Sequence, residues 1–195
     1  MASLHFVYSA MNAGKSSQLL QVAHNYEERG LTPLLYNFAG DNRYGECSIT
    51  SRIGLKRDCE VYTEETNLLQ DVAFTNTTPD CILIDEAQFL TEDQVDQLCE
   101  IVDFYNVPVM CYGLRTDFQG KLFAGSKALF AKADNLQELK TICHCGRKAN
   151  FVLRYDDSGN VVTSGDVIQI GGNEQYESVC RKHFTEVFEE KDEHL

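Results

Sequence analysis

Short apolar runs alternate with longer amphipathic stretches over the first two thirds of the chain. The apolar runs predict buried strands; they are LHFVY (residues 4–8), TPLLYNFA (32–39), CILID (81–85) and VPVMCYG (107–113). The amphipathic stretches carry apolar side chains at helical spacing and predict helices; they are residues 15–29, 91–106 and 126–133. Strands and helices in regular alternation indicate a mainly parallel sheet with helices on both faces.

From about residue 141 the pattern changes. The apolar segments become short and β-branched and are separated by turn signals such as DDSGN, which favours a small antiparallel β module. We therefore expect an α/β domain over residues 1–141, a β-rich module over 142–188 and a mobile acidic tail over 189–195. The polar stretch DNRYGECSITSR (41–52) predicts a loop within the first domain.

Composition limits the kinds of partner. A chain of 195 residues with 43% hydrophobic content can bury one substantial core and a small module beside it. The net charge of −13 disfavours binding to nucleic acid and favours small-molecule partners. The sequence shows neither a secretory leader pattern nor an apolar segment near the roughly 18 residues of a membrane span. We expect a cytoplasmic protein without a membrane partner.

The stretch YSAMNAGKSS (residues 8–17) lies between the first predicted strand and the first predicted helix. Its Gly14, Lys15 and Ser16 match the end of a Walker A phosphate-binding loop, but Ser9 stands where that pattern has its first glycine. In such a loop, backbone N–H groups and the lysine bind nucleotide phosphates, and the hydroxyl binds Mg²⁺. The sequence predicts a nucleotide site here, provided that the backbone of Ser9 keeps an ordinary conformation.

An acidic pair follows the third predicted strand, in CILIDEAQF. Asp85 ends a buried strand, the position of a Walker B acid that orients Mg²⁺ near a phosphate loop. Glu86 comes one residue later, where a carboxylate can accept a proton from an attacking hydroxyl or water. The pair therefore predicts phosphoryl transfer when it is read together with the loop.

Cysteines and histidines gather near the C-terminus. Cys143, Cys145 and Cys180 with His183 supply three thiolates and an imidazole, a ligand set of tetrahedral structural zinc. His144 is the competing fourth ligand, and buried or redox-active thiols are the alternative to metal. The other five of the eight cysteines are scattered and predict small apolar side chains in the core. A bound zinc would hold the long segment between the two ligand pairs in place.

Between these pairs lies GDVIQIGGNEQY (165–176). Its two adjacent glycines allow the backbone to approach a ligand closely, and Tyr176 can pack over an aromatic base. Alone, this segment also fits an ordinary turn.

Taken together, the segments SAMNAGKSS, DEAQF, CHC with CRKH, and VIQIGGNEQYESVC resemble the type II thymidine kinases, the zinc-containing tetrameric deoxynucleoside kinases of the salvage pathway. The similarity covers nearly the whole chain. It implies a P-loop α/β domain, a C-terminal zinc-ribbon-like module whose loop covers thymidine, and transfer of the γ-phosphoryl of ATP to the thymidine 5′-hydroxyl. It also implies Mg²⁺ with ATP, a homotetramer and feedback by dTTP.

The resemblance also assigns roles to residues. It makes Glu86 the base that takes the proton of the 5′-hydroxyl. The implied ATP and magnesium site comprises Ser9, Ala10, Met11, Asn12, Ala13, Gly14, Lys15, Ser16, Asp41, Arg43, Asp85 and Gln88. The implied thymidine site comprises Phe89, Leu114, Phe118, Val167, Ile168, Gln169, Ile170, Gly171 and Tyr176. The implied zinc ligands are Cys143, Cys145, Cys180 and His183.

Two other functions compete with a thymidine kinase. An ATPase or nucleotide-driven switch would use the same loop, with Glu86 activating water instead of a nucleoside hydroxyl. A nucleic-acid-binding zinc ribbon would need a dense basic and aromatic stripe. The metal segment offers instead five scattered basic residues in an acidic chain, namely Arg147, Lys148, Arg154, Arg181 and Lys182.

Overall fold

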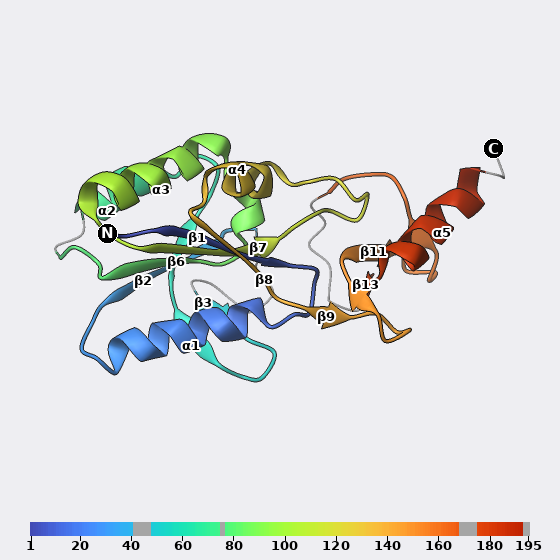
Figure 1. Ribbon diagram of the computed structural model, residues 1–195, viewed down its shortest axis with the longest axis horizontal. Coiled ribbons are helices and arrows are strands. Elements are labelled where there is room, and N and C mark those ends of the chain that lie inside the picture. Colours follow the sequence, from blue (N-terminus) through green and yellow to red (C-terminus); the bar gives the residue numbers. More distant parts are fainter. Residues whose placement is uncertain (41–47, 75–76, 168–174, 193–195) are drawn as a thin grey trace.

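Six parallel strands form the central sheet of the computed structural model, which describes residues 1–40, 48–74, 77–167 and 175–192 (Figure 1). Their order across the sheet is β5-β2-β6-β7-β1-β8, and every neighbouring pair is parallel. The strands are β1 (Leu4–Ser9), β2 (Pro33–Phe38), β5 (Glu60–Tyr62), β6 (Cys81–Ile84), β7 (Val109–Leu114) and β8 (Asn135–Glu138). The predicted parallel sheet is therefore confirmed.

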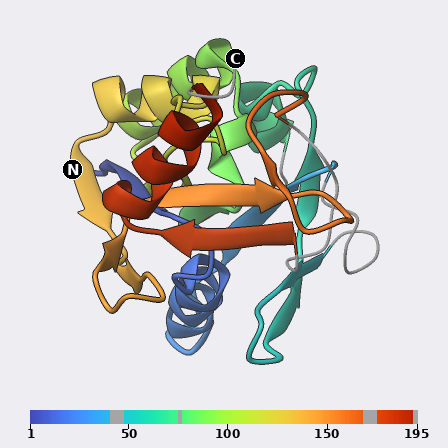
Figure 2. The same ribbon diagram turned by 90° about the vertical axis from the view of Figure 1, so that its right-hand side faces the viewer.

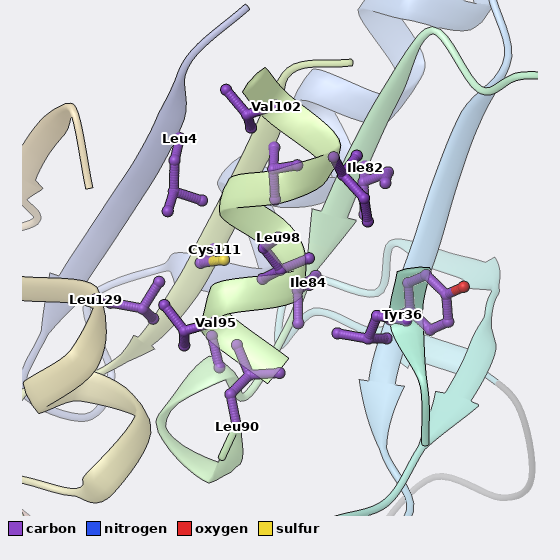
Figure 3. Close-up of a cluster of buried hydrophobic side chains, with 14 of the residues drawn as sticks. Leu4, Tyr36, Ile82, Ile84, Leu90, Val95, Leu98, Val102, Cys111 and Leu129 are labelled. Carbon is purple, nitrogen blue, oxygen red and sulfur yellow. The ribbon is translucent and has the colours of Figure 1, made fainter. Parts of the chain in front are cut away.

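Helices cover both faces of this sheet (Figure 1). One face carries α2 (Leu68–Phe74), α3 (Glu92–Tyr105) and α4 (Ala124–Lys132), and the other carries α1 (Lys15–Glu27). Figure 3 shows the larger core, in which α3 places Val95, Leu98 and Val102 against Ile82 and Ile84 of β6. A second core joins α1 to the opposite face of the sheet. Strands buried on both faces explain the continuous apolar runs of the sequence.

The C-terminal segment forms a small β module with one helix. Its strands are β9 (Thr141–Ile142), β10 (Lys148–Ala149), β11 (Phe151–Tyr155), β12 (Val161–Val162) and β13 (Tyr176–Val179), followed by α5 (Arg181–Asp192). All of its strand pairs are antiparallel, as predicted, and β11 and β13 lie side by side across the module (Figure 2). The Phe184 ring of α5 stacks on the Phe151 ring of β11 at 4.5 Å and fixes the helix to the strands.

Two predicted segments differ from the structure. Within the predicted loop 41–52, residues Ser48–Thr50 form β3 and pair with β4 (Lys56–Asp58); polar neighbours hid this strand, whose Ile49 is buried against α1. The predicted tail begins inside α5, which extends through Asp192, because Val187 and Phe188 anchor that helix to the module core. Among the described helices, none has the length and apolar character that a membrane crossing requires.

Candidate active site

A cavity of about 380 Å³ opens at the carboxyl ends of the parallel strands. The loop between β1 and α1 and the segment after β6 both line it. Residues from β3, from the end of β7 and from the C-terminal module complete the walls. Loops at this edge of a parallel sheet converge, which is why ligands of open α/β folds bind there.

The phosphate loop makes its turn through residues with left-handed backbone. Asn12 has a φ of 66° and Gly14 a φ of 84°, a conformation that glycine adopts without steric cost. Gly14 precedes the first residue of α1, so the N–H groups of the first turn of the helix point toward the cavity. Ser9 ends strand β1 with extended backbone, so the missing first glycine does not disturb the turn.

Lys15 lies at the floor of this loop. Its Nζ donates hydrogen bonds to the Oγ of Ser9 at 2.9 Å and to the carbonyl of Ala10 at 3.1 Å. Burial lowers the pKa of Lys15, and the negative charges of Glu86 and Asp85 act against that shift. The Lys15 cation lines the cavity, where a nucleotide phosphate is a natural partner for its positive charge.

Asp85 contacts the start of α1 across the cavity. Its Oδ2 accepts a hydrogen bond of 2.7 Å from the Oγ of Ser16. Asp85 is buried, and burial together with the charge of Glu86 raises its pKa to about 7, against the Ser16 hydrogen bond. A carboxylate and a hydroxyl at this distance match the oxygen ligands and water-mediated contacts that Mg²⁺ prefers. These two side chains therefore fit a magnesium ion.

Glu86 lines the cavity, and its carboxylate is hydrogen-bonded to a neighbouring side chain. Its Oε2 accepts a hydrogen bond of 2.5 Å from Gln88 Nε2, and Gln88 Oε1 in turn accepts one of 3.0 Å from the backbone of Leu114. Gln88 lies in the short helix η1 (Ala87–Phe89), which packs so closely on α4 that a Cβ on Gly125 would lie 2.6 Å from the carbonyl oxygen of Ala87. The carboxylate is therefore held by Gln88, whose own position is fixed by β7 and by the packing of η1 on α4.

Aromatic rings also line the cavity. The Phe89 ring stacks on Phe38 at 4.6 Å and meets Phe123 edge-on at 5.7 Å. The guanidinium of Arg154 lies 3.9 Å from the centre of the Phe118 ring, and its Nη1 donates to the carbonyl of Asp166. An apolar slot with such walls suits a flat base.

A cluster of sulfur and nitrogen atoms lies in the C-terminal module. Ligand atoms of Cys143, Cys145, Cys180 and His183 all lie within 4.8 Å of one another. The Cys145 and Cys180 sulfurs are 3.8 Å apart, and Cys143 Sγ lies 3.2 Å from His183 Nδ1. These four groups could hold a metal ion, and their chemistry fits structural zinc.

His144 is directed differently. Its Nδ1 lies 2.8 Å from Glu177 Oε1, and its ring stacks on that of His183 with 4.3 Å between the centroids. The Oε2 of Glu177 also accepts a hydrogen bond of 2.7 Å from Tyr155. His144 thus lies outside the four-residue cluster and packs on His183 by ring stacking.

Strand β13 connects this cluster with the cavity. Tyr176 at the start of β13 lines the cavity, and Cys180 of the cluster follows directly after its end. Between them, Ser178 Oγ donates a hydrogen bond of 2.7 Å to the carbonyl of Met11 in the phosphate loop. A metal that fixes Cys180 therefore also fixes one side of the phosphate loop.

The structure brings together most of the residues predicted for the site. Those that line the cavity are Met11, Asn12, Ala13, Gly14, Lys15, Ser16, Asp85, Glu86, Gln88, Phe89, Leu114, Phe118, Val167 and Tyr176. Ser9 and Ala10 are buried below the loop. The predicted residues Asp41, Arg43, Ile168, Gln169, Ile170 and Gly171 lie outside the described residues.

The sequence patterns did not predict several residues of the cavity wall. They are Phe38, Ser48, Ile49, Thr50, Ser51, Arg52, Thr116, Asp117, Phe123 and Val152, among others. Arg52 matters most, because its positive charge acts on Lys15 and lowers its pKa. Its segment follows β3, which was predicted as part of a polar loop, so an unrecognised hairpin concealed this side of the site.

Strand, phosphate loop, helix and an acid at the end of a nearby strand define a P-loop nucleotide-binding protein. The family model "Thymidine kinase" matches residues 2–184. A relative called thymidine kinase from Mannheimia succiniciproducens is 58% identical over 186 residues, which cover 94% of this chain and 95% of the relative. Another, from Vibrio vulnificus, is 55% identical over 188 residues, which cover 95% of this chain and 98% of the relative. The chain belongs to the thymidine kinase family.

Proposed function

We propose that this protein transfers the γ-phosphoryl group of ATP to the 5′-hydroxyl of thymidine, giving dTMP, with deoxyuridine as a second acceptor. One observation carries the proposal. The phosphate loop, Asp85, Glu86 and the Phe89 ring all line one cavity. A nucleotide on the phosphate loop and a nucleoside beside the Phe89 ring would share that cavity with the Glu86 carboxylate.

Lys15 and the N–H groups of the loop stabilise the negative charge on the phosphate oxygens as the phosphoryl group moves. Ser16 and Asp85 would hold Mg²⁺, which when bound neutralises charge on the β and γ phosphates. Arg43 and Asp41 belong to this side by resemblance, and Arg52 adds a positive charge that faces it. The protein thus acts chiefly by positioning and electrostatics.

Glu86 accepts the proton of the 5′-hydroxyl as that oxygen attacks the γ-phosphorus. A general base in this position contributes roughly 10²- to 10⁴-fold to the rate. Gln88, assigned to the nucleotide side by resemblance, holds the Glu86 carboxylate through its amide. This contact gives Gln88 a role in aiming the base.

The thymine ring binds among Phe89, Leu114 and Phe118, with Tyr176 closing over the nucleoside. By resemblance, the main chain of residues 167–171 reads the polar edge of the base. A buried base that leaves such groups unpaired is rejected strongly, which gives the enzyme its choice of pyrimidine.

Structural zinc held by Cys143, Cys145, Cys180 and His183 completes the C-terminal module. We assign residues 1–141 to ATP binding and 142–188 to this module, with its thymidine-covering loop. The proposal extends to a cytoplasmic homotetramer. It also extends to inhibition by dTTP, because a thymidine triphosphate carries both the base and the phosphates that this cavity would bind. The negative net charge and the scattered cations of the metal segment argue against a nucleic-acid partner.

The test is a panel of labelled nucleosides incubated with Mg-ATP and zinc-replete protein, scored for 5′-monophosphate. Thymidine should give the largest kcat/KM, deoxyuridine a smaller one, and purine nucleosides almost none. ATP consumption should be low without a nucleoside. Rapid hydrolysis of ATP without an acceptor would favour the ATPase instead, and failure to phosphorylate thymidine would refute the proposal.

A further inference from the structure

Glu86 has a backbone conformation that a glutamate rarely adopts. Its φ of 52° and ψ of 36° place it in the left-handed region, where the Cβ crowds the following carbonyl oxygen. A residue persists there only when its surroundings hold it, and such residues gather at functional sites. Groups around Glu86 must therefore hold its backbone in place.

Local contacts account for part of this restraint. The N–H of Glu86 donates to Asp85 Oδ1 at 3.0 Å, and its carbonyl accepts a hydrogen bond of 3.1 Å from the N–H of Phe89. Both partners belong to the same turn after β6. A further anchor for the Glu86 backbone comes from another part of the chain.

Tyr62 supplies that anchor from the edge strand β5. Its hydroxyl donates a hydrogen bond of 2.8 Å to the Glu86 carbonyl, across 24 positions of sequence. The Tyr62 side chain is fully buried, and its ring packs against Phe38 at 5.6 Å, which in turn stacks on Phe89. The donor is therefore fixed by the same aromatic wall that lines the cavity.

The protonation state of Tyr62 suits this role. Burial raises its pKa well above the usual range of a tyrosine, and the charges of Glu86 and Asp85 act in the same direction. The phenol therefore remains a donor at every pH at which the enzyme works. A buried donor and acceptor that find each other also avoid the cost of an unpaired polar group.

We propose that Tyr62 is a positioning residue for the base: its hydroxyl holds the left-handed backbone of Glu86 so that the carboxylate faces the attacking hydroxyl. This inference rests on the proposed function, because it acts through Glu86. The main chain is held by Tyr62 while Gln88 holds the carboxylate, so backbone and side chain are fixed by separate partners.

The test variant is Tyr62→Phe, which removes the hydroxyl and keeps the ring. It should fold, because the Glu86 carbonyl retains the N–H of Phe89 as a donor. We expect kcat to fall roughly 10- to 100-fold, the scale of a small misplacement of a reacting group, with the KM for ATP near that of the wild type. Tyr36→Phe is the matched control, since Tyr36 is equally buried but lies in the β2 core (Figure 3).

A double-mutant cycle with Glu86→Gln separates positioning from a general loss of structure. If Tyr62 acts through the base, Tyr62→Phe will lower kcat in the wild type and change it little in the Glu86→Gln background. Equal losses in both backgrounds, or an unchanged kcat in the single variant, would overturn the proposal. Normal turnover of Glu86→Gln itself would instead remove Glu86 from the proposed function, so the two failures give different results.

Discussion

The ammonium of Lys15 donates a hydrogen bond of 2.9 Å to the hydroxyl of Ser9, the residue that replaces the first glycine of the phosphate loop pattern. The Ser9 hydroxyl itself donates to the carbonyl of Ala10 at 2.6 Å. A glycine could do neither. The serine therefore gives the lysine a hydrogen-bond partner, and the left-handed backbone that the loop needs is supplied by Asn12 and Gly14 instead.

Replacing Ser9 by alanine should lower the stability of the ligand-free protein more than that of the ATP complex. The change removes an acceptor from a partly buried ammonium, which costs about 1–3 kcal/mol of unfolding free energy. Bound phosphate then supplies a new acceptor, so Mg-ATP should raise the melting temperature of Ser9→Ala more than that of the wild type. Thermal unfolding with and without Mg-ATP measures this difference. Ser17→Ala serves as the matched loss of a hydroxyl, and equal ATP shifts in Ser9→Ala and wild type would contradict the prediction.

Asp85 should make the stability of the ligand-free protein depend on pH. Burial and the Glu86 charge raise its pKa to about 7 in the folded state, compared with about 3.9 in an unfolded chain. The folded state therefore binds this proton more tightly, and its stability falls as pH rises from about 4 to about 7. Asp85→Asn should remove that loss, so at pH 8 its free energy of unfolding should exceed that of the wild type by on the order of a few kcal/mol.

Denaturant unfolding at pH 5 and pH 8 measures the effect of Asp85→Asn. The stability difference between variant and wild type should be larger at pH 8, where the carboxylate of the wild type is ionised. A difference that is the same at both pH values would show that ionisation of Asp85 has no such cost. The variant should also lose activity, because an amide is a poor ligand for Mg²⁺.

The two histidines of the metal module should respond differently to substitution. His183→Ala removes a ligand atom and should lower the zinc content of the purified protein below the wild-type level. His144→Ala removes a ring that stacks on His183 but lies outside the four-residue cluster, so zinc should remain bound near the wild-type level. Metal analysis after dialysis against a graded chelator measures both. Retention of zinc by His183→Ala together with its loss in His144→Ala would exchange the two roles.

Removal of the metal with a chelator is a second test of the same module. Because β13 joins Cys180 to the phosphate loop through Ser178, removal of zinc should loosen Met11 as well as the C-terminal strands. The sheet of residues 1–141 has its own core and should keep its secondary structure.

The alternation of apolar runs and amphipathic stretches predicted most of the central fold. The strands within CILID and VPVMCYG are continuous apolar runs because both of their faces are covered, so periodicity and burial agree. The hairpin around Ile49 escaped prediction, since its strands are three residues long and mostly polar. Such strands form because a neighbouring helix, here α1, buries one apolar side chain.

The candidate site also has a part that the sequence predicted and a part that only the structure showed. Gly14, Lys15 and the Asp85–Glu86 pair lie in local patterns whose chemistry can be read from a few adjacent letters, so the sequence by itself determined the type of reaction. The contacts of Ser9 with Lys15, of His183 with Cys143 and of Tyr62 with the Glu86 carbonyl join residues 6, 40 and 24 positions apart. No local pattern encodes those distances, because they depend on how the strands pack and where their ends meet. Only the tertiary structure decided which groups hold the base, the lysine and the metal ligand in place.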